Sequence, residues 1–216
     1  QARCGEFRTL IDGGIMRGAM IVATVVSTLA MGCGDADLFG PGTGGSNDGT
    51  GATDGAAGAP GTPRFEGDCS NGPLDAPRPD CQPVALASTG DPAADCVNRI
   101  NQLRWECQCL PPLERWTEGE GCADQHAEYD STRAPHSGFR DGICEPGGWA
   151  QNECPGWRST DQVVDRCLQM MWDEGPGEPF SEHGHYINMS NPSYSAVACG
   201  FHETSDGQIW AIQNFQ

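Results

Sequence analysis

Residues 194–215 read YSAVACGFHETSDGQIWAIQNF, and this stretch decides the class of the fold. Two short runs rich in aromatic and β-branched residues, Tyr194 to Phe201 and Gln208 to Phe215, carry the period-two pattern of strands. The Asp206-Gly207 pair between them is a turn signal. An earlier run, His185 to Met189, has the same pattern and is followed by Asn191-Pro192, so three short strands are expected here.

A first helix is expected well before these strands. It begins at Asp91-Pro92, where the aspartate can cap free amides and proline suits the first helical position. It ends before Pro111-Pro112. Apolar residues recur along it at helical spacing and predict one buried face, formed by Cys96, Val97, Ile100, Leu103 and Cys107.

Two further helices start at capping-box patterns, Thr117-x-x-Glu120 and Ser159-x-x-Gln162. The second helix runs to about Ser131, and the third ends at Gly175-Pro176-Gly177. Because helices come first and strands follow, the chain is expected to form a layered α+β domain with a small antiparallel sheet.

Charge limits the partners of this domain. The chain has 216 residues and a formal net charge of -18 at pH 7, and all of its basic side chains except histidine are arginines. Such an acidic surface disfavours nucleic acid and anionic membranes as partners. The same charge attracts cations, which is compatible with divalent metal binding.

The cysteine content indicates an oxidised protein. Twelve cysteines are many for a chain of this length, and none forms a C-x-x-C pair. Two of them, Cys4 and Cys33, precede the folded part. The other ten are expected to form five disulfides, in a pairing that the sequence leaves open, except that Cys107 and Cys109 should reach different partners. These ten are Cys69, Cys81, Cys96, Cys107, Cys109, Cys122, Cys144, Cys154, Cys167 and Cys199.

The N-terminal part is expected to serve export. Residues 1–33 are interpreted as an upstream segment followed by a signal peptide, with a short apolar core after Met16-Arg17. The sequence Leu29-Ala30-Met31-Gly32-Cys33 resembles a bacterial lipobox, which would make Cys33 the lipid anchor; the alternative is an ordinary signal peptide. Residues 34–64 are expected to be a disordered linker and 65–90 an irregular leader pinned by disulfides. An envelope or extracellular location follows.

Residues 91–216 resemble the CAP family (cysteine-rich secretory, antigen 5, pathogenesis-related 1), and the chain is identified as a bacterial lipoprotein member of it. The matching motifs occur in the family's order: Asn101-x-x-Arg104, Pro112-Leu113 with Trp116, Cys122-Ala123-x-x-His126-Ala127, His136-Ser137, Trp172-Asp173-Glu174, Gly184-His185-Tyr186 and Ala198-Cys199-Gly200-Phe201.

The resemblance implies a three-layer α-β-α sandwich, stapled by disulfides, with a groove where two histidines and two acidic residues meet. The histidines would be His136 and His185, and one acid would be Glu174. The other acid of the family is replaced by an amide at Gln151, with Glu153 as a displaced substitute. These five residues are the expected metal site, for Zn²⁺ or another divalent cation.

Two functions fit such a groove. One is a binding module that takes a small hydrophobic or lipid ligand, or a protein partner, and touches the membrane only through its N-terminal anchor. The other is a metal-dependent, peptidase-like hydrolase that uses His136, His185 and Glu174. His183 and His185 alternate, so on a strand they could form a second metal pair, although such a pair is more often one structural and one solvent-facing histidine. His126 is expected to be a core histidine.

Overall fold

The structure is a computed structural model that describes residues 63–216. The expected signal peptide, the Cys33 anchor and nearly all of the expected linker lie outside the described residues. No helix within the described part is long and apolar enough to cross a membrane.

The sheet has four strands in the order β1-β3-β4-β2. The expected pair of C-terminal strands forms: β3 (Ala196–Glu203) and β4 (Ile209–Phe215) are antiparallel, from Val197 opposite Phe215 to Glu203 opposite Ile209. β2 (Ala150–Trp157) is antiparallel to the other edge of β4. β1 (Glu114–Arg115) runs parallel to β3 over two residue pairs. The sheet is therefore small and antiparallel over three strands, as expected, with a short parallel edge strand that the sequence did not predict.

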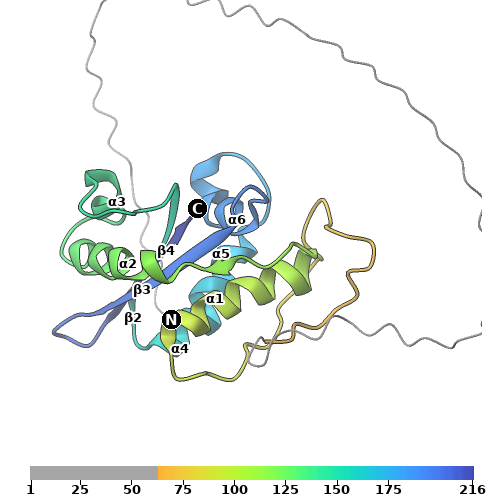
Figure 1. Ribbon diagram of the computed structural model, residues 1–216, viewed down its shortest axis with the longest axis horizontal. Helices are drawn as coiled ribbons and strands as arrows, with labels where there is room; N and C mark the ends of the chain where they lie inside the picture. The colour runs from red at the N-terminus through yellow and green to blue at the C-terminus, as the bar shows by residue number, and fades with distance from the viewer. Residues whose placement is uncertain (1–62) are drawn as a thin grey trace, which may run out of the picture. The chain divides into compact units, whose positions relative to one another are not determined.

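Helices cover both faces of the sheet (Figure 1). Successive residues of β3 point to opposite faces. Val197 and Cys199 join the main core with α1 (Pro92–Gln102) and α5 (Leu168–Asp173). On the other face, Gly200 lies so close to α2 (Thr117–Asp130) that a Cβ there would be 2.2 Å from the Asp124 amide nitrogen. This is the expected three-layer α-β-α sandwich.

Helix α1 begins as predicted, because the Asp91 side chain accepts hydrogen bonds from the amides of Ala93 and Ala94. It continues as a π-helical turn, η1 (Leu103–Cys107). The third predicted helix also begins as expected, with Ser159 accepting from the Gln162 amide. It comprises α4 (Thr160–Gln162), the π-helical η2 (Val163–Cys167) and α5.

Two local predictions were wrong. Thr117 does not cap α2: it is the first helical residue, and Trp116 occupies the cap position without a side-chain cap bond. The run His185 to Met189 is not a strand but part of α6 (Phe180–Ser190). Helical geometry lets Tyr186 pack edge-to-face on Trp172, with ring centroids 5.1 Å apart, while Met189 is also buried. A five-residue run does not distinguish the two periods.

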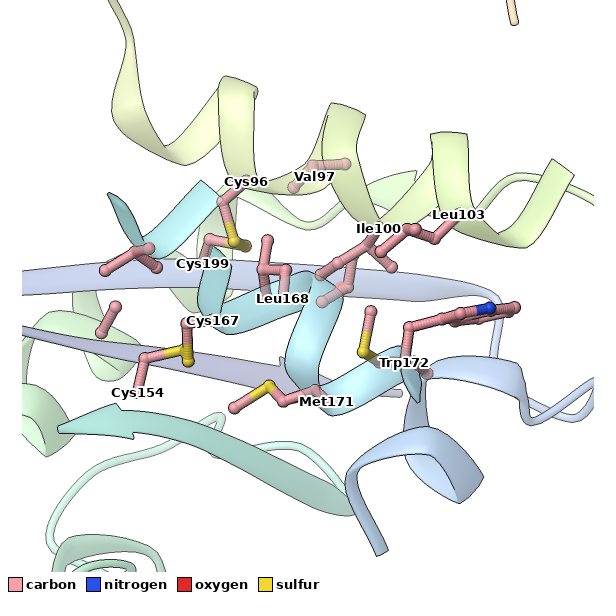
Figure 2. Close-up of a cluster of buried hydrophobic side chains, with 14 of the residues drawn as sticks. Cys96, Val97, Ile100, Leu103, Cys154, Cys167, Leu168, Met171, Trp172 and Cys199 are labelled. Atoms are coloured by element: carbon pink, nitrogen blue, oxygen red, sulfur yellow. A yellow bond between two sulfur atoms is a disulfide. The ribbon is translucent and has the colours of Figure 1, made fainter. Parts of the chain in front are cut away.

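The ten cysteines form five disulfides, as expected. Figure 2 shows two of them, Cys96–Cys199 and Cys154–Cys167. Cys96–Cys199 joins α1 to β3, and Cys154–Cys167 joins β2 to η2. Cys122–Cys144 joins α2 to the segment between β2 and α3 (Ser137–Asp141). Two of these bridges thus join the sheet to the helices α1 and η2, and the third joins α2 to a loop.

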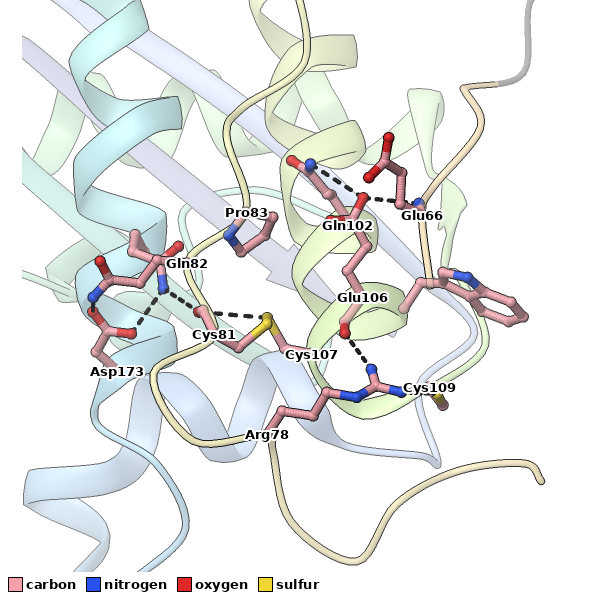
Figure 3. The surroundings of a disulfide bond; sticks show 12 residues. Glu66, Arg78, Cys81, Gln82, Pro83, Gln102, Glu106, Cys107, Cys109 and Asp173 are labelled. Carbon is pink, nitrogen blue, oxygen red and sulfur yellow. Dashed lines mark hydrogen bonds between the residues drawn. A yellow bond between two sulfur atoms is a disulfide. The ribbon is translucent and has the colours of Figure 1, made fainter. Parts of the chain in front are cut away.

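The remaining two bridges hold residues 63–90, which form neither helix nor strand. Cys69–Cys109 and Cys81–Cys107 attach this leader to the end of η1, so Cys107 and Cys109 reach different partners as predicted. Arg78 adds a hydrogen bond to the Glu106 carbonyl (Figure 3).

Candidate functional site

An open cleft of about 430 Å³ lies between the start of β2, the start of α6 and the turn before α3. Its lining includes both histidines that the sequence singled out. The lining residues are His136, Phe139, Trp149, Ala150, Gln151, Asn152, Phe180, Ser181, Gly184, His185 and Asn188. A second hollow of about 480 Å³, beside leader residues 82–88, contains neither histidine.

His185 is held by Glu174 from behind the cleft. One carboxylate oxygen, Oε1, lies 2.5 Å from His185 Nδ1, and the other accepts from the His185 amide at 3.0 Å. A carboxylate only accepts hydrogen bonds, so the ring proton lies on Nδ1. The lone pair of the ring is then on Nε2, which Glu174 does not contact.

His136 precedes α3 in a left-handed backbone conformation, with φ of 62°. Its amide donates to Glu153 Oε2 at 2.6 Å, and the next turn is fixed because the Gly138 amide donates to Asp130 Oδ1 at 2.7 Å. The ring nitrogen Nδ1 lies 2.8 Å from Gln151 Oε1. Both cleft histidines therefore use Nδ1 for a contact with the protein.

Glu153 lies behind His136 and does not line the cleft. Its side chain is 1% exposed, and its Oε2 is 3.8 Å from His136 Nδ1. Burial raises the pKa of Glu153 to about 7, and burial also raises the pKa of Asp130. Glu153 Oε1 and Asp130 Oδ2 are both buried without a hydrogen-bond partner. The displaced carboxylate that the sequence offered thus supports the His136 backbone.

The five expected metal-site residues fall into two groups. His136, His185 and Gln151 line the cleft, whereas Glu174 and Glu153 contact the histidines from outside its lining. Sequence reasoning assigned all five to one ligand set, because residue type does not reveal which side of an imidazole a neighbour occupies. The alternative pairing of His183 with His185 on a strand does not form, because both residues lie in α6. His183 Nδ1 donates to the Glu174 carbonyl at 2.8 Å, as a structural histidine would.

Another group of ligand-type atoms lies behind the sheet. In residues 63–216, three such atoms within 4.8 Å of one another occur in Cys122, His126 and Cys144. The two cysteines are joined as a disulfide, so neither offers a thiolate. His126 itself is 1% exposed, as expected of a core histidine, and burial lowers its pKa, which keeps the ring neutral.

Two exposed aromatic side chains lie at the cleft. Trp149 is 74% exposed and Phe180 is 58% exposed, and both line the cleft. The sequence predicts that the tryptophans, Trp149 among them, are core or groove-wall residues, but it gives no role to Phe180. Exposed aromatic area beside a cleft is typical of a binding surface.

Residues 97–215 match the model of the CAP family, described as the cysteine-rich secretory protein family. Among solved structures, the chain is similar to Na-ASP-1, with 16% identity and a TM-score of 0.43 over 65% of this chain and 42% of that one. It is also similar to BmVAL-1, with 17% identity and a TM-score of 0.40 over 63% of this chain and 81% of that one. The chain thus covers less than half of the length of Na-ASP-1. No curated protein matches it.

Proposed function

Because the chain belongs to the CAP family of cysteine-rich secretory proteins, we propose that it is an exported binding module whose cleft holds a small hydrophobic or lipid ligand. A divalent cation, Zn²⁺ in the first instance, would be held at His136 and His185. The family and the five disulfides are consistent with export. Attachment to the cell envelope through a lipid at Cys33 is part of the proposal.

One observation carries the proposal: each of the two cleft histidines has its Nδ1 engaged by a protein acceptor. Metal-ligating histidines usually have this arrangement, in which a second group fixes the ring and leaves the other nitrogen for the metal. The two imidazole nitrogens would supply half of a tetrahedral zinc shell, and water or ligand oxygen would have to complete it. When bound, zinc would supply a positive charge for the polar end of a ligand.

The aromatic residues suit the apolar end of the same ligand. The rings of Trp149 and Phe180 are largely exposed, so a ligand that covered them would remove apolar surface from water. An amphiphile with a carboxylate or phosphate head would place its head at the histidines and its tail across these rings. A protein partner with an apolar segment is the alternative occupant.

The second candidate function is the metal-dependent hydrolase that uses His136, His185 and Glu174. Its favourable feature is the close contact between Glu174 and His185. However, the residues that line the cleft include no aspartate or glutamate to act as a base toward bound water. Glu174 also accepts a hydrogen bond from the His185 backbone amide, so both of its carboxylate oxygens are occupied in contacts with α6. Binding without hydrolysis is thus the better-supported function.

The test uses the full chain, freed of metal and titrated with Zn²⁺ by calorimetry. We expect one tight site that is lost in His136→Ala and in His185→Ala, but retained in the control His202→Ala on β3. Binding of a medium-chain fatty acid is then measured by native mass spectrometry, with and without Zn²⁺. Zinc binding that survives both cleft substitutions would refute the metal site.

Chelator-sensitive cleavage of a peptide library separates the two functions. Cleavage that disappears in His136→Ala would favour the hydrolase. An inert protein that still retains fatty acid in its cleft supports the binding module, and loss of that retention in Trp149→Ala would locate the tail.

A further inference from the structure

The two cleft histidines are oriented by different chemical groups. Glu174 can only accept a hydrogen bond, so it fixes the proton of His185 on Nδ1 without help. Gln151 carries both an acceptor and a donor, and either end of its amide could face His136. The orientation of the Gln151 amide determines which nitrogen of His136 is free for a ligand. Other neighbours of Gln151 must therefore fix this orientation.

His126 meets the far end of the Gln151 amide. Its Nδ1 is 3.1 Å from Gln151 Nε2 and 3.3 Å from Asn214 Nδ2. Gln151 Nε2 also donates to Asn214 Oδ1 at 3.0 Å, across the β2–β4 register in which these two residues are directly opposite. Both hydrogens of the Gln151 amide nitrogen therefore have acceptors, which leaves Oε1 for His136.

Packing fixes the orientation of the His126 ring. A Cβ at Gly138 would lie 2.9 Å from His126 Cδ2, so the ring fits closely against the turn that follows His136. Phe139 packs edge-on at 6.1 Å between centroids. The other ring nitrogen, Nε2, faces the disulfide, 3.4 Å from Cys144 Sγ and 3.8 Å from Cys122 Sγ. Nδ1 is thus directed at the amide nitrogens of Gln151 and Asn214, and accepting from these two N–H groups places the ring proton on Nε2.

We propose that His126 is a positioning residue that sets the tautomer of His136 through Gln151. Were the Gln151 amide reversed while His126 and Asn214 stayed as they are, its oxygen would face two further acceptors, His126 Nδ1 and Asn214 Oδ1. That arrangement leaves buried acceptors unpaired and is disfavoured. With Gln151 held, His136 keeps its proton on Nδ1 and its lone pair on Nε2.

This inference also accounts for the amide at position 151. A carboxylate there would hold His136 in the same tautomer, but it would also draw the His126 proton onto Nδ1, which could then no longer accept from the Asn214 amide. An amide satisfies both imidazoles at once, so Gln151 and His126 form a matched pair. The inference rests on the proposed function only where it concerns metal affinity; the tautomer itself can be read without a ligand.

The test compares two replacements of nearly equal shape, His126→Asn and His126→Leu, in the full chain. Asparagine can place an acceptor oxygen where His126 has Nδ1, whereas leucine cannot. The His136 tautomer is read from two-bond ¹H–¹⁵N correlations of the ring, assigned with His136→Ala. We expect His126→Asn to keep the proton on Nδ1 and His126→Leu to move part of it to Nε2, with a 10- to 100-fold loss of Zn²⁺ affinity, on the order of that for outer-shell changes.

A double variant separates loss of the acceptor at position 126 from a general disturbance of the fold by His126→Leu. Gln151→Glu in the His126→Leu background supplies an acceptor-only group, and we expect it to restore the Nδ1 proton of His136. A merely structural role for His126 predicts no such restoration. An unchanged tautomer in folded His126→Leu, or no restoration in the double variant, would overturn the inference. A shifted tautomer with unchanged Zn²⁺ affinity would support it and refute the metal part of the proposed function.

Discussion

Glu153→Gln should change the pH dependence of stability in a way that the structure fixes in sign and size. Burial raises the pKa of Glu153 from 4.5 to about 7 in the folded protein. A group whose folded pKa is raised favours the folded state while it is protonated. Its contribution is therefore fully present below about pH 4.5 and is lost as the pH rises to about 7. Above that pH, the ionised carboxylate lies buried with Oε1 unpaired.

The size follows from the same shift. Each tenfold change in a proton equilibrium corresponds to about 1.4 kcal/mol, so the shift to about 7 amounts to about 3 kcal/mol of lost stability above neutral pH. Glutamine keeps an oxygen to accept from the His136 amide and removes the ionisation. We expect Glu153→Gln to be more stable than the parent protein above pH 7, by up to about 3 kcal/mol. Below pH 4.5 the two proteins should differ little.

Denaturant unfolding with the disulfides intact measures this difference at pH 4, 6 and 8. Glu128→Gln on the exposed side of α2 is the matched control, because it changes the net charge by the same amount. Titrating groups remote from position 153 cancel in the difference, whereas Asp130 is coupled to Glu153 because its charge also raises the pKa of Glu153. A stability difference between Glu153→Gln and the parent that is independent of pH, or that grows toward acid, would refute the raised pKa of the buried Glu153 carboxyl.

Three further outcomes are expected. Replacing both cysteines of the Cys96–Cys199 bridge by serine should lower the free energy of unfolding by about 5 kcal/mol, because this bridge closes a loop with a sequence separation of 103. The same change in the Cys154–Cys167 bridge, with a separation of 13, should lower it by about 3 kcal/mol. Denaturant unfolding measures both losses, and the reverse order would contradict the prediction. Gly200→Ala should destabilise the protein by about 1–3 kcal/mol, because the new Cβ would clash with the α2 backbone. The control Gly121→Ala in α2 should not destabilise it, because a Cβ there meets no other atom. Equal melting temperatures for the two variants would count against the close packing of α2 on β3. Trp149→Ala should alter stability by less than about 0.5 kcal/mol, since the ring is 74% exposed, yet weaken fatty-acid retention; a large loss of stability would show that the ring is structural.

The sequence predicted those parts of the fold where local chemistry and tertiary packing agree. The Asp91 and Ser159 caps, the strand pair of residues 194–215 and the set of ten bridged cysteines are of this kind. β2 escaped prediction because Gln151, Asn152 and Glu153 are polar yet buried at its centre, which removes the apolar alternation of a strand. Its polar residues are buried because they support the cleft histidines.

The metal-binding role of the candidate site residues stays a prediction, and only their places in the fold can be compared with the sequence. His136 and His185 do line one cleft. Which ring nitrogen each neighbour occupies depends on backbone turns such as the left-handed His136, and these have no signature in composition or spacing. The contact between His126 and Gln151 likewise arises only when β2, β4 and α2 are packed together.

The central claim is that His136 and His185 present Nε2 to one cleft as ligands for a divalent cation. An anomalous difference map at the zinc absorption edge, from crystals grown with Zn²⁺, tests it most directly. We predict a peak in the cleft at about 2.0–2.1 Å from Nε2 of both histidines. Zinc bound only elsewhere on this acidic protein, or bound through Nδ1, would contradict the account.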